Sequence, residues 1–151
     1  MKVLICDDSK FMRTIIKNNL KKIDENIEII GEASNGEESI KKYKELKPDF
    51  VTLDVVMDNK NGEEVLKEIM QYDKGAKIIM VSSMGQEPII LNTIKDGAID
   101  FVVKPFSMDS LSKSITMLKY RLRKWKITRF FFTRNVLFFY NNYIQKQYFV
   151  V

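Results

Sequence analysis

The chain has 151 residues, one cysteine and no histidine, and its formal net charge is +5. This length is sufficient for one domain with its own hydrophobic core. One cysteine excludes a disulfide framework, and the lack of histidine excludes histidine as a metal ligand or acid–base catalyst. Charge follows Met1 too soon for a signal peptide, and no apolar stretch approaches the ~20 residues of a membrane span, so we expect a cytoplasmic protein.

The charge is unevenly distributed along the chain. Residues 1–112 hold 16 Lys and Arg and all 20 Asp and Glu, whereas residues 113–151 hold nine basic residues and no acidic one. We therefore divide the chain into a mildly acidic domain, residues 1–120, and a basic, aromatic extension, residues 121–151, which can continue the last helix.

Five short apolar runs predict the strands of a parallel sheet covered on both faces. In chain order they occupy residues 3–6, 27–32, 50–53, 78–81 and 101–103. The second run is the most polar, so we expect it near an edge of the sheet.

Between and after these runs, apolar residues recur at helical spacing. The helix starts are indicated by Ser9, Asn35-Gly36, Gly62, Pro88 and Ser107. Pro48 stops the second of these helices, and Gly97 fits the C-terminal cap of the fourth. Five strands alternating with five helices predict a doubly wound α/β fold.

Polar side chains follow four of the predicted strands at the point where each strand ends. The carboxyl ends of parallel strands meet at one edge of the sheet, where ligands bind in this class of fold. We therefore expect five side chains to converge there, namely Asp7, Asp8, Asp54, Ser82 and Lys104.

This set of side chains suits phosphoryl chemistry. Crowded carboxylates repel one another and favour a hard cation, and oxygen ligands suit Mg²⁺. Lys104 and Ser82 could neutralise and orient a phosphoryl group, and an aspartate such as Asp54 can accept it as a nucleophile. A metal-dependent phosphatase of similar topology remains an alternative, although such enzymes usually have a second Asp two residues after the nucleophile, where this chain has Val56.

Over residues 1–120 the chain resembles a response-regulator receiver domain. The matching motifs are Ile5-Cys6-Asp7-Asp8-Ser9, Leu53-Asp54-Val55-Val56-Met57, Asn61-Gly62, Ser82 and Val103-Lys104-Pro105-Phe106. Phe101 stands at the position of the aromatic switch residue of the family. The resemblance implies a flavodoxin-like (βα)5 fold with a five-stranded parallel sheet in the order 2-1-3-4-5.

The resemblance also implies roles for individual residues. Asp54 would accept a phosphoryl group from a histidine kinase, assisted by Ser82 and Lys104. The ligands of Mg²⁺ would be Asp7, Asp8, Asp54 and the backbone carbonyl of Val56. Phosphorylation would move Ser82 and Phe101, and the Lys104–Pro105 peptide bond would be cis.

The stretch Ser82-Ser83-Met84-Gly85-Gln86 and the lack of an output domain within these residues are similar to single-domain chemotaxis regulators. This similarity implies a chemotaxis-type kinase as phosphoryl donor and a flagellar motor switch protein as target. We expect this protein to be a monomer that contacts the target through its fourth helix, fifth strand and fifth helix. A stand-alone receiver in a phosphorelay is an alternative. A transcription regulator using the basic tail is another, although no helix-turn-helix spacing supports nucleic-acid binding.

Three positions depart from the family pattern, and the extension has no equivalent in it. Asp58 stands where proline is common, Ser83 where alanine is common, and Phe101 where some members have tyrosine. We expect none of these to prevent phosphorylation. For the extension three interpretations stay open: a chance extension without function, a segment packing on the domain or a second copy, and a surface for nucleic acid or anionic membrane.

Overall fold

The computed structural model describes residues 1–127, with side chains described for residues 1–122; predictions for residues 128–151 lie outside this range. In chain order the elements are β1 (Lys2–Cys6), α1 (Lys10–Ile23), β2 (Glu28–Ala33), α2 (Gly36–Leu46), β3 (Phe50–Leu53), α3 (Gly62–Tyr72), β4 (Ile78–Ser82), α4 (Glu87–Lys95), β5 (Asp100–Val103) and α5 (Met108–Ile127). The predicted alternation of five strands and five helices is confirmed, with boundaries shifted by one residue at several strand ends.

The chain divides into two units, residues 1–118 and residues 119–151. The first unit contains one sheet whose strands are all parallel and follow the order β2-β1-β3-β4-β5. This is the order that the resemblance implied. Consequently β1, β3 and β4 lie in the interior of the sheet, while β2 and β5 form its edges.

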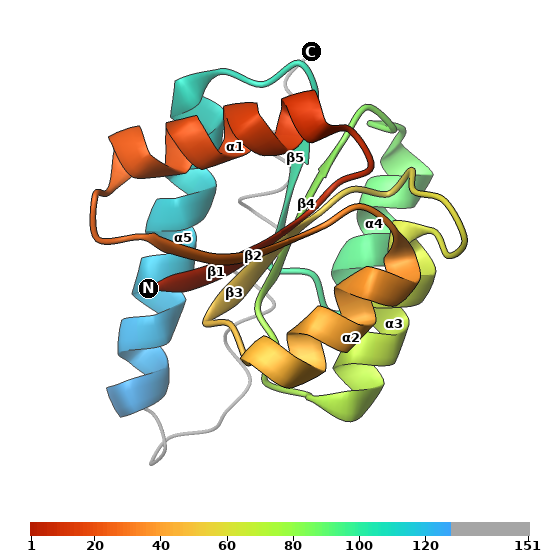
Figure 1. Ribbon diagram of the computed structural model, residues 1–151. Helices are drawn as coiled ribbons and strands as arrows, with labels where there is room; N and C mark the ends of the chain where they lie inside the picture. Colours follow the sequence, from red (N-terminus) through yellow and green to blue (C-terminus); the bar gives the residue numbers. More distant parts are fainter. Residues whose placement is uncertain (128–151) are drawn as a thin grey trace. The chain divides into compact units, whose positions relative to one another are not determined.

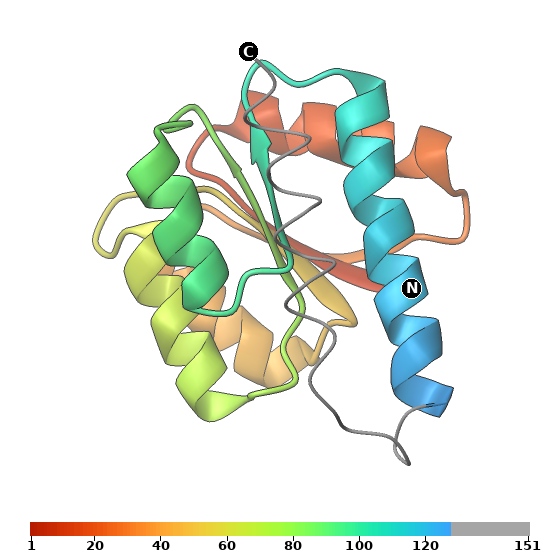
Figure 2. The same ribbon diagram turned by 180° about the vertical axis from the view of Figure 1, so that it is seen from behind.

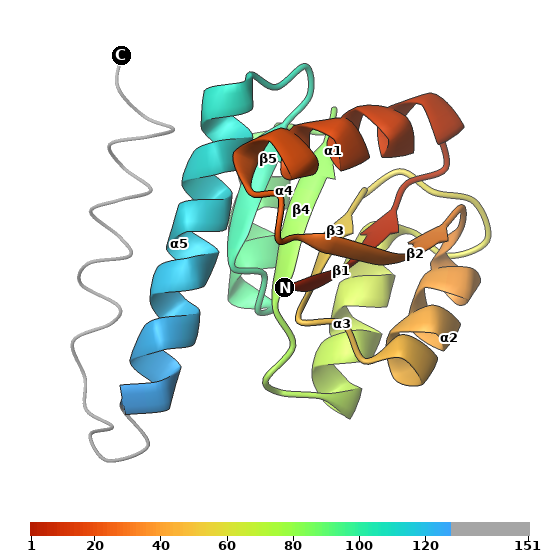
Figure 3. The ribbon, with the colours of Figure 1, turned by 60° about the vertical axis from the view of Figure 1, so that its left-hand side comes forward.

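Helices cover both faces of this sheet. Figures 1 and 3 show α2, α3 and α4 on one face, and α1 with the first turns of α5 on the other. Seen from behind, β5 lies between α4 and those first turns of α5 (Figure 2). Apart from Lys2 at the start of β1, every residue of the interior strands is buried, which explains why their sequences are mostly continuous apolar runs. Each fully buried aliphatic side chain there contributes about 1.5–3 kcal/mol.

The helix starts follow from capping side chains. Ser9 Oγ accepts a hydrogen bond from the Met12 N–H at 3.3 Å, and Asn61 forms a reciprocal capping box with Glu64 at 2.9 and 3.1 Å. The side-chain oxygens of Asn35 and Ser107 cap their helices by accepting from the Glu38 and Ser110 N–H groups, at 2.9 and 3.2 Å. After the C-terminal end of α4, Gly97 has a φ of +113°, a left-handed conformation that glycine adopts without strain.

Gly62 determines how closely α3 approaches the end of β3. A β-carbon at this position would lie 1.9 Å from the Asp54 carbonyl oxygen, so only glycine fits without moving the backbone. The Gly62 N–H also donates to the Val55 carbonyl at 2.8 Å. The short loop after Asp54 is therefore fixed at both ends. Among the described residues, no helix is long and apolar enough to cross a membrane.

Candidate functional site

The predicted polar residues meet at the carboxyl edge of the sheet. Asp7 follows β1, Asp54 follows β3 and Lys104 follows β5, and the two carboxylates are buried, with 0% and 5% of their surface exposed. Lys104 Nζ lies 2.6 Å from Oδ2 of Asp7 and 2.6 Å from Oδ2 of Asp54. One ammonium group thus bridges the carboxylates at the ends of two neighbouring strands.

The backbone holds the two acids in place. The Asp54 N–H donates to the Cys6 carbonyl at 2.9 Å, and the Asp7 N–H donates to the Ala33 carbonyl at 3.1 Å. These bonds continue the sheet ladder one residue beyond each strand. The Asp54 carboxylate is oriented further by the Val56 N–H, which donates to Oδ1 at 3.1 Å. Both side-chain oxygens of Asp54 therefore have a defined partner.

The acids form a candidate cation site. Ligand oxygens of Asp7, Asp8 and Asp54 all lie within 4.8 Å of one another, and Asp8 is exposed to solvent. Such an all-oxygen set, partly buried and partly open, fits a hard divalent cation that keeps some of its water. Val56 is 49% exposed beside this cluster. The role of its carbonyl as a ligand stays a prediction.

Burial sets the electrostatics of this cluster. Burial raises the pKa of Asp7 above its ordinary value, an effect that the Lys104 ammonium and the Ser9 N–H oppose. For Lys104, burial alone would lower the pKa, but its hydrogen bonds to Asp54 and Asp7 outweigh this and raise it. Lys104 is therefore a cation at neutral pH. The desolvation that disfavours ionised Asp7 is a cost that a bound cation would offset.

The two residues predicted to switch are both buried. Ser82 ends β4 with 0% of its surface exposed, and its Oγ accepts a hydrogen bond from the Met84 N–H at 3.3 Å. Its carbonyl accepts from the Lys104 N–H at 2.8 Å, which links the loops after β4 and β5. Phe101 is 1% exposed and pairs in register with Met80. The structure thus places Ser82 beside the backbone of Lys104 and Phe101 inside the core.

The departures from the family pattern lie outside the carboxylate cluster. Ser83 and Asp58 are both exposed. The Asp58 carbonyl accepts hydrogen bonds from the Gly36 and Lys60 N–H groups, at 3.3 and 2.8 Å. The Lys104–Pro105 bond is cis, as the resemblance implied.

One residue at this site was not predicted from the sequence. Arg13, in α1, donates from one terminal nitrogen to the carbonyls of Asp7 and Asp8, at 2.8 and 3.3 Å. Its Nε donates to Glu32 at 3.0 Å. The only signal in the sequence is that position 13 begins the second turn of a helix capped by Ser9, where a long side chain can reach back over the preceding loop.

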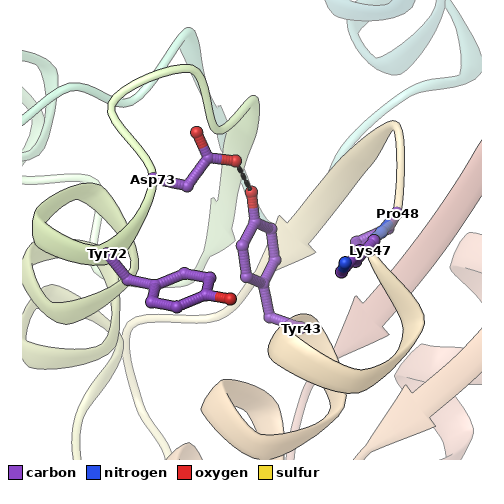
Figure 4. A pocket seen from close by; sticks show the side chains of 5 residues that line it. All are labelled: Tyr43, Lys47, Pro48, Tyr72 and Asp73. Carbon is purple, nitrogen blue, oxygen red and sulfur yellow. Dashed lines mark hydrogen bonds between the residues drawn. The ribbon is translucent and has the colours of Figure 1, made fainter.

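Two hollows on the described surface contain none of the five predicted residues. The one shown in Figure 4 has a volume of about 320 Å³ and is lined by Tyr43, Lys47, Pro48, Tyr72 and Asp73. The Tyr43 hydroxyl donates to Asp73 Oδ2 at 2.7 Å. The second hollow, about 610 Å³, follows the edge strand β2. The acidic cluster is thus a small polar site at the sheet edge, distinct from both hollows.

Comparison with known proteins identifies the class. Residues 3–116 match the response regulator receiver domain. The chain therefore belongs to the family of response regulator receiver domains, and it is a signalling switch rather than a metabolic enzyme. The match does not extend to residues 117–151.

Similar proteins narrow the class further. The chemotaxis protein CheY of Listeria monocytogenes is 50% identical over 115 residues, which cover 76% of this chain and 95% of that protein. CheY of Thermotoga maritima is 51% identical over 105 residues, 70% of this chain and 86% of that one. In the solved CheX–CheY–BeF3–Mg complex from Borrelia burgdorferi, the matching chain has a TM-score of 0.75 and 34% identity, with 79% of this chain and 89% of that chain covered. The chain is a CheY-like response regulator of the chemotaxis type.

Proposed function

We propose that Asp54 accepts a phosphoryl group from a histidine kinase and that this charge changes what the domain binds. The observation that supports the proposal most strongly is the convergence of Asp54, Asp7 and Lys104, with both carboxylates 2.6 Å from one ammonium group. A carboxylate held beside a fixed cation is suited to phosphoryl transfer, which depends mainly on positioning and on charge stabilisation.

In the transfer step, an oxygen of Asp54 attacks the phosphorus of a phosphohistidine. A P–O bond forms, the P–N bond breaks, and the imidazole nitrogen keeps the electron pair and is protonated. Lys104 would turn from the Asp54 carboxylate toward the new phosphoryl oxygens, and the Ser82 hydroxyl would donate to another of them. Loss of the phosphoryl group by attack of water would reset the switch.

A divalent cation belongs to this proposal. The acidic cluster fits Mg²⁺, and the similar CheY in the Borrelia complex was solved with Mg and BeF3. The residues that would hold the ion are Asp7, Asp8, Asp54 and the Val56 carbonyl. When bound, the ion would supply positive charge that offsets the repulsion between the three carboxylates and the phosphoryl oxygens.

The effect of the new charge would reach the surface through a rearrangement at Ser82. When the Ser82 hydroxyl turns to the phosphoryl group, it gives up the Met84 N–H, and the loop before α4 moves. The space vacated near β5 would let Phe101 change rotamer. The surface altered is that of α4, β5 and the first turns of α5 (Figure 2).

The partners follow from the chemotaxis-type relatives. We propose a chemotaxis histidine kinase as donor and a flagellar motor switch protein as target, in the cytoplasm. A phosphorelay is the competing assignment. The two are distinguished by measuring phosphotransfer from a labelled chemotaxis kinase and from a labelled phosphorelay transfer protein; faster transfer from the second would favour the phosphorelay.

The central test uses acetyl phosphate and Mg²⁺, followed by intact-mass measurement. We expect a Mg²⁺-dependent, hydroxylamine-sensitive phosphoryl adduct that Asp54→Asn abolishes. Ser82→Ala should form the adduct but lose the change in amide spectrum at α4 and β5. Ser83→Ala, one residue further along and exposed, is the matched control and should behave as wild type. A folded protein without any adduct would overturn the proposal.

A further inference from the structure

The loop between β1 and α1 contains two of the proposed cation ligands, and Arg13 contacts both of them through the backbone. One Arg13 terminal nitrogen donates to the Asp7 carbonyl at 2.8 Å and to the Asp8 carbonyl at 3.3 Å. The Arg13 side chain is only 13% exposed. A half-buried guanidinium with several fixed hydrogen bonds defines the direction of the carbonyls that it binds.

The consequence for Asp7 follows from the planarity of the peptide bond. The Asp8 carbonyl and the Ser9 N–H belong to one trans peptide unit, so they point in opposite directions. With the carbonyl directed at Arg13, the N–H is directed to the other side, where it donates to Asp7 Oδ1 at 2.9 Å. Arg13 and the Asp7 carboxylate are thus bonded to opposite edges of the same peptide unit.

An ion pair with Glu32 holds the Arg13 side chain in place. Its Nε donates to Glu32 Oε2 at 3.0 Å, and Glu32 lies on the edge strand β2. The other Glu32 oxygen forms an ion pair with Lys17, one turn further along α1. Hydrogen bonds and charge from Lys17 and Arg13 lower the pKa of Glu32, so it stays ionised at neutral pH. The guanidinium is therefore fixed between an edge strand and the ligand loop.

We propose that Arg13 is a positioning residue of the cation site: by fixing the peptide between Asp8 and Ser9 it orients the Asp7 carboxylate for the metal. This inference rests on the proposed function, because it concerns the same Mg²⁺ site. Residues that orient metal ligands without touching the metal typically contribute 10–100-fold to affinity. We expect the loss of Arg13 to weaken Mg²⁺ binding about tenfold.

Whether the loss of Arg13 weakens or tightens Mg²⁺ binding distinguishes a positioning role from a purely electrostatic one. Arg13 is a cation close to a cation site, so removing its charge would tighten Mg²⁺ binding if only through-space electrostatics acted. The positioning role predicts the opposite. It also predicts that Arg13→Lys weakens binding, because a lysine keeps the charge but has no rigid fork for two carbonyls and Glu32.

The test is a Mg²⁺ titration of the full chain by calorimetry, without phosphodonor. Arg13→Met and Arg13→Lys should both weaken binding, the first about tenfold. Lys17→Met is the matched control, since it removes the same charge from the same helix and the same Glu32 partner without touching the loop; its affinity should equal or exceed that of wild type. Equal changes in Arg13→Met and Lys17→Met would overturn the inference.

A second measurement does not require the metal. In amide hydrogen-exchange spectra without Mg²⁺, Arg13→Met should lose protection at the Ser9 N–H, while amides of β3 and β4 keep theirs and so report an intact fold. An unchanged Ser9 amide would contradict the positioning role. Failure of wild type to bind Mg²⁺ would instead refute the proposed cation site, whatever the Ser9 amide shows.

Discussion

Lys104 Nζ lies 2.6 Å from Asp54 Oδ2, although 50 positions separate the two residues along the chain. The same ammonium group bonds to Asp7, so two buried carboxylates share one cation. Breaking a buried ion pair by removing one partner is costly, because the remaining charge is left uncompensated. The stability of the domain should therefore depend on what occupies this position.

Replacing Lys104 by methionine tests this dependence. In EDTA we expect Lys104→Met to lower the free energy of unfolding by about 3 kcal/mol, measured by urea denaturation. Saturating Mg²⁺ should restore more stability to this variant than it adds to wild type, because the ion replaces the missing positive charge. Lys60→Met is the control, since its 2.6 Å pair with Glu68 is solvent-accessible and should matter little. Equal stability of Lys104→Met and wild type in EDTA would contradict this account.

A buried hydroxyl provides a second prediction. Thr52, in the interior strand β3, is 0% exposed, and its Oγ1 has no hydrogen-bond partner among the described residues. A buried polar group without a partner is destabilising, and valine has nearly the same shape. We expect Thr52→Val to raise the free energy of unfolding by about 1 kcal/mol, measured by thermal and urea denaturation.

Thr93 is the matched control for this substitution. It is equally buried, but its hydroxyl bonds to the Ile89 and Ile90 carbonyls at 3.0 and 2.9 Å. Thr93→Val should therefore be neutral or destabilising. If Thr52→Val lowered stability as much as Thr93→Val, the Thr52 hydroxyl would have a partner that the structure does not show.

The sequence was sufficient to predict the alternation of strands and helices, because buried parallel strands require continuous apolar runs and helices require spaced ones. It was also sufficient to predict that Asp7, Asp54 and Lys104 converge, because parallel strands end at one edge. It could not predict that one ammonium bridges both acids, since this depends on side-chain direction. Nor could it predict the Thr52 hydroxyl without a partner or the Arg13 fork, which depend on contacts between elements far apart in the chain.

The hydrogen bond between Tyr43 and Asp73 predicts a weakness at high pH. Tyr43 is 5% exposed, and burial, followed by its bond to the Asp73 carboxylate, raises the Tyr43 pKa above its ordinary value of 10.0. The unfolded chain therefore loses this proton first as pH rises, whereas the folded chain keeps it. Stability should fall as pH rises above 10.0, until the folded form also ionises.

Tyr43→Phe isolates this contribution. At neutral pH it should cost about 1–2 kcal/mol, because Asp73 loses a hydrogen-bond donor. Above pH 10.0 its stability should fall less steeply than that of wild type. Urea midpoints measured across this range give both quantities. Identical slopes for wild type and Tyr43→Phe would count against the argument.

At the acid end, Glu38 makes the corresponding contribution. The Lys42 ammonium lies 2.7 Å from its carboxylate, and the Ser34 N–H donates to it at 2.7 Å. These bonds, that of Lys42 first, lower the Glu38 pKa from 4.5 to about 2. The lowered pKa of Glu38 stabilises the fold fully when the pH is above the pKa of the unfolded chain, and this stabilisation is lost as pH falls from 4.5 to about 2.

Glu38→Gln should therefore make the loss of stability less steep in this pH range, measured by urea midpoints. Glu37→Gln, at the neighbouring residue of the same helical turn, is the control substitution. A Glu38→Gln variant as acid-sensitive as wild type would show that other carboxylates dominate this transition.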